Sequence, residues 1–149
     1  MSGVTYLPVK GEYHDNFLTA QAAARGRLDR DAQKSLFDRL DWLDALHRMA
    51  LRDKAPLLLR AHDGDADVWM PLMHLAGGQY GALANWYNFT WRPIFGQATD
   101  EVTRLALLRQ LAATARDHSR RLTLAPLPDE DQSATELATA FEQAGWVVE

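Results

Sequence analysis

Apolar residues recur at helical spacing in three segments of the chain. The first segment, residues 35–50, opens with a serine suited to an N-cap, and the second, residues 100–118, follows Thr99 in the same role. The third begins at residues 133–136, which form a capping-box sequence, and ends at Gly145. The expected buried faces are Leu36, Leu40, Leu43, Leu46 and Ala50, then Val102, Leu105, Leu108, Leu111 and Ala115, then Leu137, Phe141 and Ala144. The pattern predicts three amphipathic helices, each packed against another element.

Shorter apolar runs predict strands between and after these helices. Two runs flank the turn-forming residues 62–65 and predict a β-hairpin, and a third run follows the glycine pair at residues 77–78. The predicted strands cover residues 55–61, 68–75, 79–89, 121–125 and 146–148. The order is helix, three-stranded meander, helix, strand, helix, strand. The expected fold class is therefore α/β in the α+β sense, with a mixed, mainly antiparallel sheet.

The first 34 residues show the weakest pattern. A short strand could form at residues 4–9, and the alanine-rich run at residues 20–34 could be a helix or a mobile arm. We treat residues 1–34 as an N-terminal strand or arm and residues 35–149 as an α/β domain, in a chain that forms a single domain overall. A length of 149 residues with 47% hydrophobic content suits one ordinary core.

Composition and charge narrow the classes of partner. The chain has no cysteine, which removes disulfides, thiolate metal ligands and a cysteine nucleophile. Its formal net charge is −4 and its basic residues are scattered, so nucleic acid is not an expected partner. No segment has the apolar length of a membrane span or the pattern of a signal peptide. The expected location is cytoplasmic, without membrane association.

Three stretches, taken together and in this order, are similar to a known superfamily. They are residues 36–43 (LFDRLDWL) in the first helix, residues 83–89 (LANWYNF) in the third strand, and residues 140–146 (AFEQAGW) at the end of the last helix. With them the chain resembles the GNAT acyltransferase superfamily, most closely the N-terminal lobe of Fem-type aminoacyltransferases and CelD-like acetyltransferases. The resemblance covers residues 35–148 and implies a GNAT-like sheet with helices on both faces. We expect an incomplete or half lobe, because the family's last strand has no match in the sequence.

The resemblance also implies a cofactor, acetyl-CoA or another acyl-CoA, whose pyrophosphate rests on backbone amides at the N-terminus of a helix. The family motif there is Arg or Gln, two residues, Gly, one residue, then Gly or Ala. Residues 92–98 (RPIFGQA) stand at this place but are one residue longer, with Phe95 where the first small residue belongs. The candidate cofactor-binding residues are Arg92, Gly96, Ala98 and Thr99. The alternative is an ordinary strand-to-helix connection that needs no ligand.

Aromatic residues gather around the third predicted strand and the segment after it. Trp86, Tyr87 and Trp91 are candidate contacts for an acceptor, a small-molecule or peptide amine, and the alternative is burial beneath helices on both sides of the sheet. The family often takes its catalytic acid from a tyrosine four residues before the glycine. Phe141 stands at that place and has no hydroxyl. No catalytic residue is assigned.

A metal site is not expected. Residues 62–67 (HDGDAD) place carboxylates at alternate positions, as at the start of an EF-hand loop. However, Val68 stands where that loop requires glycine, and His74 where it requires a bidentate glutamate. A solvated hairpin tip is the preferred interpretation.

Two functions remain open. The first is a GNAT-like acyltransferase domain that transfers an acyl group from CoA to an amine, with a degenerate cofactor loop. The second is a non-catalytic GNAT-fold lobe that acts as a binding or assembly module, as a homodimer or with a second acyltransferase lobe. The strand at residues 146–148 would leave a sheet edge, which we expect the N-terminal segment, a second copy or a second lobe to cover.

Overall fold

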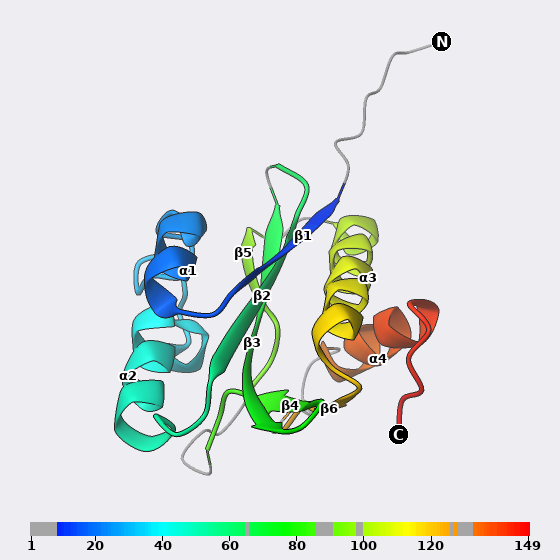
Figure 1. The fold of residues 1–149 in the computed structure, drawn as a ribbon. Helices are drawn as coiled ribbons and strands as arrows, with labels where there is room; N and C mark the ends of the chain where they lie inside the picture. The colour runs from blue at the N-terminus through cyan, green and yellow to red at the C-terminus, as the bar shows by residue number, and fades with distance from the viewer. Residues whose placement is uncertain (1–8, 65, 86–90, 98–99, 126, 128–132) are drawn as a thin grey trace.

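A six-stranded sheet lies between two pairs of helices in the computed structural model of the chain (Figure 1). The structure describes residues 9–64, 66–85, 91–97, 100–125, 127 and 133–149. The strands are β1 (Lys10–His14), β2 (Pro56–His62), β3 (Asp67–Ala76), β4 (Gln79–Ala82), β5 (Ile94–Gln97) and β6 (Arg121–Thr123). The helices are α1 (Phe17–Ala24), α2 (Leu40–Ala50), α3 (Glu101–His118) and α4 (Ser133–Gln143), with a 3-10 turn at Leu36–Asp38. The fold class is α+β, as the sequence predicts.

The sheet is antiparallel apart from one pair of strands. Its order is β1-β2-β3-β4-β6, and β5 pairs with β3 beside this path. The predicted hairpin is confirmed as β2 and β3, with Leu58 opposite Pro71. Both β4 and β5 pair antiparallel with β3, β4 from Leu72 onward and β5 at the strand's start near Asp67. β6 runs parallel to β4, and α3 provides the long connection that leads into it.

Both faces of the central strands are buried, because alternate residues point to opposite sides. On one face, β2 and β3 pack with α3 and α4 through Leu57, Leu59, Ala61, Val68, Met70 and Leu72. On the other face, Leu58 of β2 and Trp69 of β3 pack with α1 and α2. Figure 1 shows the two helix pairs on opposite sides of the sheet. Burial on both sides explains why these two strands are almost continuously apolar in sequence.

The N-terminal residues belong to the same layers. β1 pairs antiparallel with β2, from Lys10 opposite His62 to His14 opposite Leu58. Helix α1 covers only the start of the alanine-rich run at residues 20–34, because it ends where Arg25 takes a left-handed conformation. The strand expected at residues 4–9 falls outside the described residues except for Val9, which lies in no strand.

Helix α2 starts later than the sequence predicts. Ser35 precedes a short 3-10 turn and makes no side-chain cap, and Arg39 is extended. Tertiary contacts override the helical pattern here: the Leu40 amide donates to the Leu28 carbonyl, and the Arg39 side chain donates to the backbone carbonyls of Gln33 and Lys34. Leu40, Leu43 and Leu46 are buried as expected, whereas Leu36 and Ala50, which were expected on the same buried face, are exposed.

Helix α3 is confirmed, with two corrections. Its N-cap is Asp100, whose carboxylate accepts from the Thr103 amide at 2.7 Å, and this bond lowers the pKa of Asp100. Thr99, the expected cap, lies outside the described residues. Val102 was expected to be buried but is 78% exposed. The buried positions are Leu107, Leu108, Leu111, Ala112, Thr114 and Ala115, which form a face rotated away from Val102.

The later strands are shorter than predicted. β4 ends at Ala82, after which the Leu83 amide donates to the Pro71 carbonyl, and residues 86–89 of the expected strand lie outside the described residues. β6 covers Arg121–Thr123, the first part of the expected run. Residues 94–97, expected in a loop, form β5.

The end of α4 is a Schellman turn rather than the start of a strand. Gly145 has a φ of 97°, the Trp146 amide donates to the Phe141 carbonyl, and the Gly145 amide donates to the Glu142 carbonyl. The Trp146 ring packs on Phe141, and its indole N–H donates to the Ala112 carbonyl of α3 at 2.9 Å. The glycine stop is confirmed, while the strand at residues 146–148 is wrong, because Trp146 is held against helices.

Among the described residues, no helix combines the length and the apolar character needed to cross a membrane.

Gly145→Ala tests the Schellman turn at the end of α4. The substitution should lower the free energy of unfolding by about 1–2 kcal/mol, because a side chain at this positive φ is strained. Its Cβ would also meet Arg116 Nη1 at 2.6 Å. Gly77→Ala is the matched control, since Gly77 also has positive φ but no atom within 4 Å of a new Cβ. Urea unfolding of both variants should show the larger loss at Gly145, and equal losses would contradict the role of the Arg116 contact.

Candidate functional site

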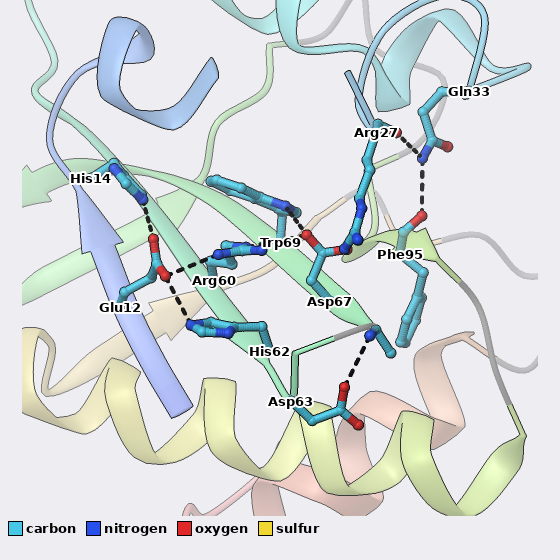
Figure 2. A network of polar contacts seen from close by, with 11 residues as sticks. Glu12, His14, Arg27, Gln33, Arg60, His62, Asp63, Asp67, Trp69 and Phe95 are labelled. Carbon is cyan, nitrogen blue, oxygen red and sulfur yellow. Dashed lines mark hydrogen bonds and ion pairs between the residues drawn. The ribbon is translucent and has the colours of Figure 1, made fainter. Parts of the chain in front are cut away.

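A group of charged side chains lies across β1, β2 and β3 on the sheet face that carries α1 and α2 (Figure 2). We call Glu12, His14, Arg60, His62 and Asp67 the charged network. Arg60 joins its two carboxylates: Nη1 donates to Glu12 Oε1 at 3.0 Å and Nε donates to Asp67 Oδ2 at 3.1 Å. The register explains the first contact, because Glu12 stands directly opposite Arg60.

Glu12 lies between two imidazoles. Its Oε1 is 3.0 Å from His62 Nε2, and its Oε2 contacts His14 Nε2. The other ring nitrogen of His14 lies 3.0 Å from the Thr19 hydroxyl of α1, so the network ties β1 to that helix. Partial burial opposes ionisation of Glu12, but the hydrogen bond from His14 and the positive charge of Arg60 outweigh it, and the pKa of Glu12 lies below its ordinary value.

Asp67 is the most deeply buried charged group of the network, with no exposed surface. Its Oδ2 accepts from Arg60 and, at 3.1 Å, from the indole N–H of Trp69. Its Oδ1 lies 3.3 Å from Arg27 Nη1, an ion pair without hydrogen-bond geometry. Two guanidinium groups therefore neutralise one buried carboxylate, which would otherwise carry a large desolvation cost.

The segment after α1 is fixed beside Asp67 by backbone contacts. The Gln33 side-chain amide donates to the Arg27 carbonyl at 3.0 Å and to the Phe95 carbonyl of β5 at 2.9 Å. Figure 2 shows Gln33 between these two carbonyls, with the Arg27 side chain extending to Asp67. Arg27 and Gln33 thus connect the charged network on β1, β2 and β3 with the turn after α1 and with β5.

Together with Arg27, the charged network contains two carboxylates and two guanidinium groups, and their ion pairs join β1, β2, β3 and the turn after α1. Glu12 and Asp67 each face Arg60, and Arg27 adds a second cation at Asp67. Within the described parts of the chain, no three His, Asp or Glu side chains are arranged to hold a metal ion.

The predicted cofactor residues that the structure describes make internal contacts. Arg92 Nη2 donates to Asp38 Oδ2 at 3.0 Å, and the Asp38 carboxylate is almost fully buried. Gly96 lies in β5, where an added Cβ would stand 2.2 Å from Asp67 Oδ1. The close approach of Asp67 explains why a glycine is needed at this position. Ala98 and Thr99 lie outside the described residues.

Of the three predicted acceptor residues, the structure describes Trp91. Trp91 is 2% exposed, and its indole N–H donates to the Pro71 carbonyl at 3.0 Å, so its ring belongs to the core on the α3 side. Trp86 and Tyr87 lie outside the described residues. Trp91 and Arg92 are neighbours in sequence, yet one contacts β3 and the other contacts the 3-10 turn. The contacts of these two described residues therefore lie in different parts of the fold.

A groove of about 510 Å³ lies along β6, and we call it the β6–α4 groove. It is lined by residues 120–124, by Leu127 and by the tail at residues 146–149, and we call the first and last of these segments its two walls. The floor comes from α4 through Ala134, Leu137, Ala138 and Phe141. Its volume is within the range of ~300–1,000 Å³ that is common for ligand pockets.

Spacing on α4 explains the shape of this groove. The four α4 residues follow the i, i+3, i+4, i+7 pattern of one helix face. Leu137 and Phe141 are buried against the core, while the small side chains of Ala134 and Ala138 leave room beside them. Sequence reasoning identified this face as apolar but did not find the groove, because the groove depends on where the tail lies.

Comparison of the chain with protein-family models, with curated proteins and with solved structures found no match in any of the three.

A double-mutant cycle tests the reason for Gly96. Gly96→Ala should cost about 1–3 kcal/mol of unfolding free energy through overpacking. Asp67→Ala should cost about 3 kcal/mol, because it leaves the partly buried guanidinium groups without their partner. The loss of unfolding free energy in the double variant should be clearly smaller than the sum of the two single losses, since the clash between the new Cβ and Asp67 disappears. Additive losses in chemical denaturation would contradict the proposed contact.

The pH dependence of stability tests Glu12. Because its pKa is lowered in the folded state, ionised Glu12 stabilises the fold above its ordinary pKa of 4.5. This contribution is lost as the pH falls through the lower, folded pKa. The difference in unfolding free energy between wild type and Glu12→Gln should therefore shrink as the pH falls below 4.5. A difference that grows below pH 4.5 would show that the sign is wrong.

Proposed function

We propose that this chain is a GNAT-like lobe that acts as a non-catalytic binding module and holds its ligand in the β6–α4 groove. The observation that carries the proposal is the groove itself, about 510 Å³ with an apolar floor and with polar residues at its walls. Such a combination of apolar area and a few polar groups is typical of binding sites. A cytoplasmic location and a homodimer or second lobe as assembly partner belong to the same proposal.

The contacts of the predicted cofactor residues support a non-catalytic lobe. Arg92 donates to a carboxylate of the protein, and Gly96 accommodates another carboxylate. A pyrophosphate at this place would compete with Asp38 and Asp67 for the same groups. Phe141 is 5% exposed and has no proton to donate, which supports the absence of a general acid at this position.

One observation favours the second candidate, an acyl-CoA-dependent N-acyltransferase with a small-molecule or peptide amine as acceptor. β4 and β6 are parallel neighbours whose pairing covers only three residues on each strand. The resemblance places acyl-CoA where two neighbouring strands separate. In that case Arg92, Gly96, Ala98 and Thr99 would lie near the cofactor and Trp86, Tyr87 and Trp91 near the acceptor.

A thermal-shift titration with acetyl-CoA and a long-chain acyl-CoA separates the two candidates. A ligand that binds the folded state at 100 times its Kd raises stability by about 2.7 kcal/mol. We expect no shift at millimolar acyl-CoA, and no difference between wild type and Arg92→Lys, the control that keeps a cation beside Asp38. A saturable shift that Arg92→Lys weakens would reject the binding module and support the transferase.

A further inference from the structure

We propose that the β6–α4 groove binds an extended, acidic segment of a partner protein, which joins the sheet as an additional strand beside β6. The inference deepens the proposed binding function and rests on it. It follows from the position of β6 in the sheet, from the walls of the groove and from its charges.

β6 is a sheet edge within the part of the chain that the structure describes. It pairs with β4 along one side, and no other described strand pairs with it. Five consecutive residues, 120–124, line the groove, while no residue of β4 does. Because β6 and not β4 lines the groove, we infer that it lies along the unpaired side of β6. A free strand edge offers backbone donors and acceptors that an extended segment can pair with.

The walls of the groove suit alternating side chains. Leu122 and Leu124 point to the same face of the strand and pack against the core, so they leave apolar surface at the groove's base. On the opposite wall, Val147 is 87% exposed and Val148 is 40% exposed. Neither valine is explained by core packing, and both would lose exposed apolar surface beneath an inserted strand.

The length of the edge limits the ligand to a short segment. Residues 120–124 span roughly 17 Å at about 3.3 Å per residue, which fits about five residues of an extended peptide. The tail at residues 146–149 faces this edge across the groove. A helix, about 10 Å wide with its side chains, would gain no backbone bonds from a strand edge.

The charges of the groove favour an acidic segment. Arg120 and Arg121 are both exposed, and neither guanidinium takes part in an ion pair within the described residues. Glu149 is the third residue of the lining with a charged side chain, so the side chains of the lining sum to +1 from two cations and one anion. An Asp or Glu at one end of the bound segment would pair with the two adjacent arginines, and the apolar residues would lie over the floor.

The test is selection from a randomised heptapeptide display library on the full chain, followed by fluorescence polarisation with the enriched peptides. We expect strand-forming sequences with Asp or Glu at one end. Arg121→Glu should weaken their binding at least tenfold, because it reverses a charge beside the acid. Ala138→Leu should also weaken binding, since it fills the floor. Arg52→Glu makes the same charge change at an exposed residue outside the groove and should leave binding unchanged.

The other results overturn the inference in distinguishable ways. Enriched peptides that require Ala138 but lack acidic residues, or that bind as helices in their circular dichroism spectra, would reject the acidic strand and keep the binding module. Peptides that bind equally to Ala138→Leu would place the partner elsewhere. If no peptide is enriched, the strand proposal is rejected, and the acyl-CoA titration then decides whether the binding module is rejected with it. Thermal unfolding of each variant shows whether it is folded.

Discussion

The buried carboxylate of Asp67 fixes the arrangement of one end of the sheet. A charge without any exposed surface has to be neutralised where it lies, and here the cations come from β2 and from the turn after α1. The same carboxylate accepts from Trp69 and approaches Gly96 so closely that β5 must have no side chain there. One carboxylate thus brings together the β2–β3 hairpin, the turn after α1 and β5. These segments are therefore expected to fold together, because none of them completes its contacts with Asp67 alone.

The molecule has two ends of different character. At the β1 end, cations and anions are matched within the protein, and Arg92 with Asp38 extends the same principle to the 3-10 turn. At the β6 edge, two arginines face solvent and two valines remain exposed. The first end has its electrostatic partners already and the second does not. For this reason we propose that ligand binding occurs at the β6 edge, although the family resemblance pointed to residues such as Arg92 at the other end.

The elements that the sequence predicts well are those decided by local pattern. The β2–β3 hairpin, helix α3 and the glycine stop of α4 all follow from alternation, helical spacing or the requirement for positive φ. β1 was missed because Lys10–His14 is mostly polar and becomes a strand only through pairing with β2. The charged network could have been suspected from Arg60, a charge inside an apolar run, but its partner Glu12 lies 48 residues earlier. The groove could not be predicted, since it depends on where Trp146 is held.

The Schellman turn after α4 has a consequence for motion. Trp146 joins the tail to both α3 and α4, so the outer wall of the groove is rigid only while the last turn of α4 is formed. β6, with three paired residues, is the shortest strand of the sheet. Short edge strands and helix ends are among the first parts of a protein to open locally, and their amides exchange with solvent early. A strand bound between them would convert an edge into the interior of a sheet. Slower exchange of the β6 amides would then report occupancy of the groove directly.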